Sequence, residues 1–246
     1  STYRTLLNTL GFATTTVVIA LFFAVPMAWL VERTDLPGKN LIFALATIGA
    51  LVPTFFTSMG WVFLLHPRIG IINKFLMELF GLEQAPFNIA SLVGMGWVEG
   101  LGLSSIAFIM IVATYRSMDP ALEEAARVHG LGILRTLRYV TLPLTFPGII
   151  AAAIYIFTIG LSAFEVPAII GMSNKIFTFS TFIFYKIQPQ EELPSYGMAG
   201  AVSSLLVVLA LLLSWGYFRT LKFSHRYAVV TGKGYRPRLV ELGRRG

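Results

Sequence analysis

Long runs of apolar residues alternate with short polar segments along the chain. Five of these runs exceed the roughly 20 residues that an α-helix needs to cross the hydrocarbon core of a bilayer. They are 5–31, 41–65, 92–117, 145–170 and 198–218. The charged residues inside them are Glu99, Arg116 and Glu165. The pattern predicts an all-α membrane protein with five transmembrane helices.

The connection between the second and third predicted spans, residues 66–90, is longer than a turn requires. Its apolar residues recur at helical spacing, at Ile72, Phe75, Leu76, Leu79 and Phe80. We expect a short helix that ends at Gly81 and lies in the outer membrane interface. The pattern fits a helix that covers the bundle at least as well as a helix that binds substrate.

Composition agrees with a membrane protein. Asp, Glu, Lys and Arg make up 13% of the residues, about half the roughly 25% of a soluble domain, and the mean hydropathy is +0.74. The chain has no cysteine, which excludes disulfides and thiolate metal clusters. It begins with Ser1 and has no basic and apolar leader, so we expect a further segment, including another span, before it in the parent protein.

Lysine and arginine are distributed unequally between the two sides of the predicted helices. When alternate connections are assigned to opposite sides, one side holds 14 basic residues and the other holds five. Cytoplasmic connections are enriched in Lys and Arg, which places residues 119–143 and the basic tail 223–246 in the cytoplasm. This topology accounts for the net charge of +7, because basic residues near the cytoplasmic membrane surface interact with membrane lipid. No nucleic-acid partner is therefore expected.

One polar segment between the third and fourth spans is longer than a simple connection, and it reads EEAARVHGLGILRTLRYVTLPL. Asp119 and Pro120 suit the N-cap and first position of a helix, and Gly130 suits the left-handed turn that ends it. A second short helix with an apolar stripe then follows, and we expect Leu142 and Pro143 to end it at the start of the fourth span. So much ordered sequence predicts a docking surface.

This segment resembles the EAA signature of bacterial ABC importer permeases, in which Glu-Ala-Ala precedes, at fixed spacing, a Gly and then an aliphatic residue, any residue, Leu and Pro. The matching residues are Glu124, Ala125, Ala126, Gly130, Val140, Leu142 and Pro143, with Glu123 directly before them. The resemblance implies the MetI-like permease fold, with a cytoplasmic coupling loop at 119–143 that docks on a separate dimer of ATPase subunits. It implies that ATP binds to those subunits. It also implies that a second permease half or subunit and a periplasmic or extracellular substrate-binding protein complete the transporter.

Further segments resemble the iron(III)-type permeases, which are related to polyamine and thiamine importers. They are LLNTLGFATTT, VPMAWLVERTDLPGK, SLVGMGWVEGL, RSMDPALEEAA and FEVPAIIG. The resemblance implies a transmembrane permease domain over 1–222, followed by a tail that links it to a second homologous half. It also implies a place in the bacterial inner membrane and iron(III) as substrate, with polyamine, thiamine or another small solute as alternatives.

Four residues are candidates for lining a translocation pathway: Glu99, Glu165, Ser162 and Ser58. Carboxylates are costly inside a membrane and often functional there. Both acids lie near the outer ends of their predicted spans, so an acidic vestibule for a cation and two carboxylates wetted by headgroup water both fit the pattern.

The sequence predicts no catalytic residue and no metal-ligand set. It also lacks the glycine-rich phosphate loop of an ATPase, so ATP hydrolysis is expected on another subunit and no cofactor on this chain. An ion-coupled secondary transporter or channel is the alternative class, and it leaves the EAA spacing unexplained.

Overall fold

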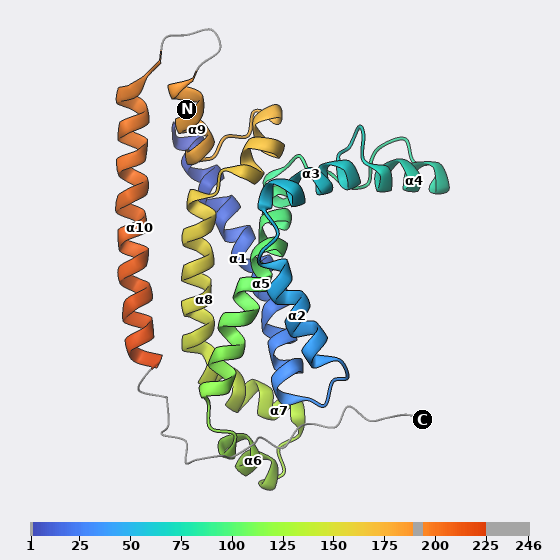
Figure 1. The fold of residues 1–246 in the computed structure, drawn as a ribbon, viewed down its shortest axis with the longest axis vertical. Coiled ribbons are helices and arrows are strands. Elements are labelled where there is room, and N and C mark those ends of the chain that lie inside the picture. The colour runs from blue at the N-terminus through green and yellow to red at the C-terminus, as the bar shows by residue number, and fades with distance from the viewer. Residues whose placement is uncertain (1, 189–193, 225–246) are drawn as a thin grey trace. The chain divides into compact units, whose positions relative to one another are not determined.

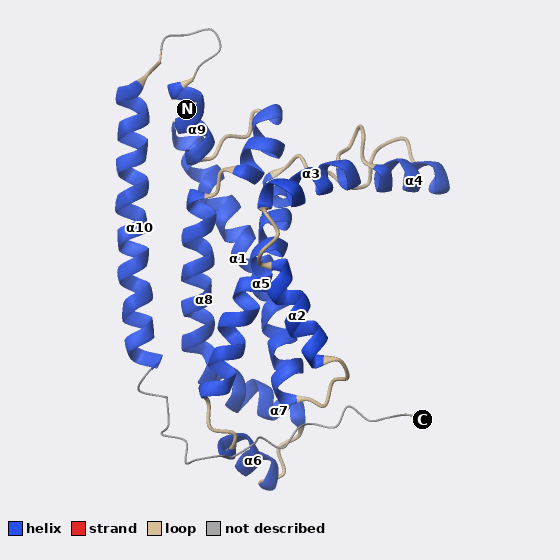
Figure 2. Ribbon diagram, in the orientation of Figure 1, coloured by secondary structure: helices blue, strands red, loops and turns tan. Residues whose placement is uncertain are grey.

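The computed structural model describes residues 2–188 and 194–224, and its elements are coloured along the chain in Figure 1. The helices of this part are α1 (Thr2–Arg33), α2 (Lys39–Gly49), α3 (Thr54–Leu65), α4 (Ile71–Phe80), α5 (Leu92–Ser117), α6 (Ala121–Val128), α7 (Ile133–Thr136), α8 (Leu142–Ser162), α9 (Phe179–Ile187) and α10 (Tyr196–Ser224). Shorter helical segments are η1 (Leu137–Thr141), η2 (Pro167–Gly171) and η3 (Met172–Asn174). Figure 2 shows these helices joined by loops. Of the predicted tail, residues 225–246 lie outside the described residues.

The chain forms two compact units. The first unit comprises Ser1–Ala20, Leu51–Leu103 and Ile156–Leu213, and the second comprises Leu21–Ala50, Ser104–Tyr155 and Ser214–Gly246. The helices α1, α5, α8 and α10 contribute residues to both units. α3, α4 and α9 belong to the first unit, and α2, α6 and α7 belong to the second.

Four helical segments of the described chain are long and apolar enough to cross a membrane. They are Thr2–Arg33, Leu92–Ser117, Ile133–Ser162 and Tyr196–Arg219. α2 and α3 together meet the same test and make a fifth span if they are counted as one. The prediction of an all-α membrane protein is therefore confirmed.

The second predicted span, 41–65, is not one continuous helix. α2 ends at Gly49, α3 begins at Thr54, and the pair is bent by 99° at this break. Pro53 lies directly before α3 with extended backbone angles. Proline has no N–H to donate and disfavours the α-conformation of the preceding residue, which explains why the helix is interrupted there.

The fourth predicted span, 145–170, also differs from the structure. α8 begins earlier, at Leu142, and ends at Ser162, well before residue 170. Pro167 cannot donate a helical hydrogen bond to the carbonyl of Ala163, four residues earlier. That carbonyl instead accepts a hydrogen bond from the Ser180 hydroxyl, so the break is satisfied within the first unit. Glu165 consequently lies beyond α8 and not inside a continuous span.

Small residues allow close helix contacts in both units. In the first unit, a Cβ atom at Gly96 of α5 would lie 2.6 Å from the Thr15 side chain of α1. In the second unit, a Cβ at Gly148 of α8 would lie 2.2 Å from Thr114 Oγ1 of α5. Close approach of backbones through small residues is a main source of helix association in lipid. The glycines therefore set the packing of α5 against both neighbouring helices.

The predicted short helix in the 66–90 connection is confirmed as α4, and Gly81 ends it with a φ of 63°. Buried Asn73 holds this connection together, because its side-chain amide donates to the carbonyls of Leu65 and Phe87 and accepts from the Phe87 N–H. Most apolar side chains of α4 are exposed. Its location in the outer membrane interface stays a prediction.

Candidate functional site

The 119–143 segment starts as its sequence predicts. Asp119 Oδ1 accepts a hydrogen bond of 2.9 Å from the Ala121 N–H, and Pro120 already has helical backbone angles. Asp119 therefore satisfies one of the N–H groups that have no partner within a first helical turn. The helix that follows, α6, is eight residues long and carries Glu123 and Glu124 in its first turn, where negative charge complements the helix dipole.

Gly130 ends α6 in the left-handed conformation, as predicted, with a φ of 83°. Its N–H donates to the Arg127 carbonyl, and the Leu131 N–H donates to the Ala126 carbonyl. This pair of bonds is the Schellman arrangement, which satisfies the last carbonyls of a helix while the chain reverses. α6 and α7 consequently form a compact helical hairpin that packs together within the second unit.

The second short helix does not end at Leu142 and Pro143, contrary to the prediction. α7 continues through η1 directly into α8, so Ile133–Ser162 is one helical segment. η1 is a π-helical turn in which the Leu142 N–H bonds the Leu137 carbonyl. The wider turn makes room for Pro143, whose ring would crowd the carbonyl four residues before it in a regular α-helix. The loop is therefore continuous with a membrane-spanning helix.

Four large apolar residues of the α6–α7 hairpin are exposed. This surface, which we call the hairpin face, consists of Leu122, Val128, Ile133 and Leu134. Val128 is 86% exposed and Leu134 is 78% exposed. Of the neighbouring EAA residues, Ala125 is exposed, whereas Glu124 and Ala126 are partly buried. Exposed large apolar side chains beside a polar turn are candidates for an interaction surface.

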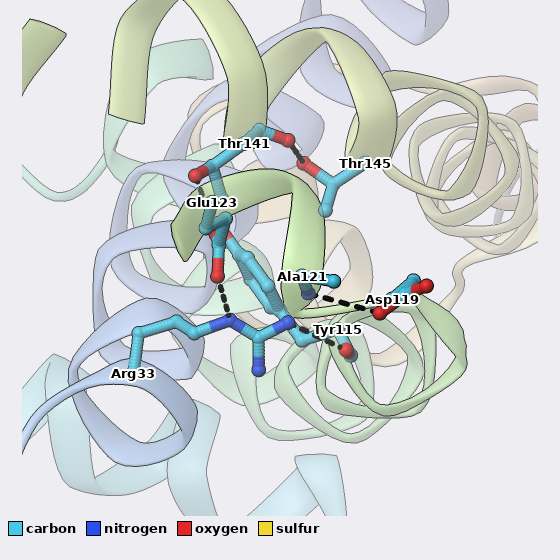
Figure 3. Close-up of polar contacts among 7 residues, drawn as sticks. All are labelled: Arg33, Tyr115, Asp119, Ala121, Glu123, Thr141 and Thr145. Atoms are coloured by element: carbon cyan, nitrogen blue, oxygen red, sulfur yellow. Dashed lines mark hydrogen bonds and ion pairs between the residues drawn. The ribbon is translucent and has the colours of Figure 1, made fainter. Parts of the chain in front are cut away.

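Glu123 lies on the opposite side of α6 and is buried, although the sequence grouped it with the residues expected to face a partner. Figure 3 shows its carboxylate between Arg33 and Thr141. Arg33 Nε donates to Glu123 Oε2 at 2.7 Å, and the Thr141 hydroxyl donates to Oε1 at 2.5 Å. Arg33 Nη2 also donates to the Tyr115 carbonyl at 2.9 Å, and the guanidinium lies 5.4 Å from the centre of the Tyr115 ring.

This buried set joins the last residue of α1, the end of α5, the start of α6 and the η1 turn. Thr145, on the first turn of α8, extends it by donating to the Thr141 carbonyl at 2.9 Å. In the sequence, Arg33 is one of the 14 basic residues assigned to the cytoplasmic side, and nothing near it indicates a further role. Its partner is 90 residues away, so nothing local in the chain indicates the pair.

The four pathway candidates all belong to the first unit. Ser58 is buried and its hydroxyl donates to the Thr54 carbonyl, while exposed Ser162 donates to the Ile159 carbonyl. Both hydroxyls are thus engaged within their own helices. Glu99 is buried and its Oε2 atom makes no hydrogen bond among the described residues, whereas Glu165 is exposed. The two carboxylates lie close enough to act on each other electrostatically.

Within residues 2–188 and 194–224, no group of three or more His, Asp or Glu side chains is arranged to hold a metal ion. The described chain therefore presents a helical hairpin at 119–143 and two acids in the first unit.

Comparison with known proteins identifies the family. The sequence profile of the "Binding-protein-dependent transport system inner membrane component" family matches residues 16–219. The galactooligosaccharides transport system permease protein GanP of Bacillus subtilis is 26% identical over 89% of this chain and 53% of its own length. The ferric transport system permease protein FbpB of Actinobacillus pleuropneumoniae is 26% identical over 92% of this chain and 31% of its own length. The molybdenum transport system permease protein ModB of Haemophilus influenzae is 31% identical over 63% of this chain and 66% of its own length.

Solved structures share the fold. A chain in the crystal structure of a bacterial alginate ABC transporter, in complex with an alginate-bound periplasmic protein, has a TM-score of 0.66 at 20% identity, covering 94% of this chain and 80% of that chain. A chain of the MetNI methionine ABC transporter in an inward-facing conformation has a TM-score of 0.62 at 16% identity, covering 90% and 95%. The chain spans about half the length of GanP and about a third of FbpB. With its membrane-spanning helices and the match over most of its length, this multi-pass inner membrane protein belongs to the family of binding-protein-dependent transport system permeases, the membrane components of ABC importers.

Proposed function

We propose that this chain forms part of the translocation path of an ATP-driven importer, and that its 119–143 loop docks on a separate ATPase subunit. The observation that carries the proposal is the hairpin face. Val128 and Leu134 are large apolar residues left exposed beside the Schellman turn at Gly130. A partner that covers them removes apolar area from water, which is favourable by about 25 cal/mol per Å².

In this proposal the loop is cytoplasmic, as the distribution of basic residues favours. ATP binds between paired ATPase subunits, and their closure displaces the docked loops. Because η1 joins the hairpin to α8 without a break, a displacement of the loop acts directly on a membrane-spanning helix. Rigid helix movements of this kind alternate the access of a path between two sides of a membrane. A second permease half and an external substrate-binding protein complete the assembly.

The test adds a charge to the hairpin face at Val128 and reverses the charge of the neighbouring EAA residue Glu124. We expect Val128→Glu and Glu124→Lys to insert in the membrane normally but to lose co-elution with the ATPase subunit and ATP-dependent uptake. The matched control is Asn40→Glu, which adds a charge at an exposed position of the same unit outside the loop. If both loop variants recruit the ATPase and transport as the control does, the docking assignment is refuted.

For the substrate we propose iron(III). The segment resemblance to iron(III)-type permeases supports it, as does the similarity to a protein named as a ferric transport permease. The exposed Glu165 carboxylate adds an electrostatic argument, because a negative charge raises the local concentration of a cation and lowers that of an anion. Other relatives are named for galactooligosaccharides, molybdenum and sulfate.

Uptake by a strain that lacks the gene decides between these substrates. Labelled iron(III), polyamine, thiamine, molybdate and sulfate are supplied in turn to the deletion strain and to the complemented strain. We expect only iron accumulation to depend on the gene, and to fall when Glu99→Gln and Glu165→Gln are combined. Unchanged iron accumulation together with gene-dependent uptake of another solute would reject iron.

A further inference from the structure

The buried pair of Arg33 and Glu123 differs from an ordinary surface ion pair in its burial. The Arg33 and Glu123 side chains are 4% and 5% exposed. The buried pair joins α1 to α6, whereas a second ion pair in the same unit, Arg116 with Glu32, joins α5 to α1 and has side chains that are 58% and 15% exposed. Only the buried pair includes a residue of the 119–143 loop.

The geometry around Glu123 uses both carboxylate oxygens. Arg33 satisfies one oxygen, and Thr141 of the η1 turn satisfies the other. A guanidinium also has a fixed planar set of donors, and a second one of these bonds the Tyr115 carbonyl at the end of α5. The orientation of Glu123 is therefore fixed directly by Arg33 of α1 and Thr141 of η1. α5 contributes indirectly, because its Tyr115 carbonyl orients the Arg33 guanidinium.

The α6 helix needs such a support. It has eight residues, and α7 has four, whereas isolated helices shorter than about 12–15 residues are marginal in water. The hairpin therefore keeps its position through contacts with the rest of the second unit. Arg33 is the last residue of α1, a helix of 32 residues that is long and apolar enough to cross the membrane.

We propose that Arg33, Glu123 and Thr141 are positioning residues that fasten the 119–143 loop to α1, so that α1 moves with the loop when an ATPase displaces it. The inference rests on the proposed docking function for its ATPase step. Without the fastening, force on the loop would reach the membrane only through η1 and α8. The loop would still dock and ATP would still be hydrolysed, while the amount of substrate moved per ATP would fall.

Two variants separate positioning from simple stability. Glu123→Ala leaves a buried guanidinium without its carboxylate, so we expect less assembled protein. In the double variant Arg33→Met with Glu123→Leu, apolar side chains replace both charges, which restores packing without restoring the directed bonds. We expect the double variant to assemble with the ATPase like the parent, yet to show roughly 2- to 30-fold less uptake per ATP hydrolysed. Glu32→Gln is the matched control and should leave uptake per ATP unchanged.

A measurement independent of the ATPase uses spin labels on cysteines placed at Met27 of α1 and Val128 of α6, because the native chain has no cysteine. We expect a narrow distance distribution in the parent and in Glu32→Gln, and a broad one in the double variant. The inference is overturned if the double variant keeps the narrow distance distribution. It is also overturned if the double variant keeps the parental uptake per ATP. If the parent protein itself recruits no ATPase subunit, the proposed docking function is refuted. The label distances remain a test of whether the Arg33–Glu123 pair fastens the loop to α1.

Discussion

Replacing Gly130 is the most direct test of the turn that shapes the hairpin. A Cβ atom at this position meets nothing within 4 Å, so a substitution changes the backbone energy without a steric clash. The φ of Gly130 is 83°, in the left-handed region of the backbone. A residue with a Cβ atom is destabilised there by about 1–2 kcal/mol, and a backbone held in a strained conformation costs about 1–3 kcal/mol. Asparagine tolerates this region better than β-branched residues do. Gly130→Val should therefore disturb the turn, and Gly130→Asn should largely preserve it.

The expected size of the effect follows from the free energy. Since 1.4 kcal/mol corresponds to a factor of ten, a cost of about 1–3 kcal/mol lowers the population of the native turn about 5- to 150-fold relative to other loop conformations. The same cost is small beside the insertion of several apolar helices into lipid. We therefore expect Gly130→Val to reach the membrane at the parental level and to bind the ATPase subunit with an affinity lower by up to that factor.

The assay measures membrane content by immunoblot, and affinity by titration of the purified permease with its ATPase subunit in lipid nanodiscs. Uptake is measured on the same variants. Gly130→Asn should stay within a few-fold of the parent in both quantities. Equal affinities for the Val and Asn variants would refute the reasoning, because they would mean that the left-handed turn is not required for docking.

The close helix contact and the orientation give two further predictions. Gly148→Ala should lower the free energy of unfolding by about 1–3 kcal/mol, because the added Cβ overlaps the Thr114 side chain. The control Gly102→Ala should not lower it, because a Cβ there meets nothing within 4 Å. SDS titration measures both free energies. Ser173→Cys should react with a membrane-impermeant maleimide in intact cells, and Ser117→Cys only after the membrane is opened, since both positions are exposed in the structure and the basic residues place them on opposite sides. The reverse labelling pattern would contradict a cytoplasmic loop.

Features with a local signal in the sequence were predictable. The third span matches α5 at both ends, and the turns at Gly81 and Gly130 take the left-handed conformation that their sequence context predicts. These features depend on a run of apolar residues or on one glycine after a helical pattern. Neither needs information from distant parts of the chain.

Helix breaks were less predictable, because proline alone does not determine them. Pro26 and Pro147 lie inside α1 and α8, whereas helices are interrupted at Pro53 and before Pro167. A proline frees a backbone carbonyl, and the outcome depends on what satisfies it. At Ala163 that group is the Ser180 hydroxyl, 17 residues further along the chain.

The site was predictable in part for the same reason. The EAA residues could be located from their spacing, but the direction in which each side chain points could not. Glu123 and Glu124 are adjacent and chemically identical, yet Glu123 is 4% exposed while Glu124 is only partly buried. The difference is made by Arg33 and Thr141, which approach Glu123 from elements distant in sequence.

The separation of the two sides of α6 has a consequence for exchanging loops between transporters. Glu123 holds the helix from its inner side, while Leu122, Ala125 and Val128 are exposed on the outer side. Substitutions on the outer side leave every hydrogen bond of Glu123 in place. If the loop docks on an ATPase as proposed, substituting a few outward residues would adapt it to a foreign ATPase. Transplanting a whole loop without its own arginine would leave a carboxylate buried without a partner.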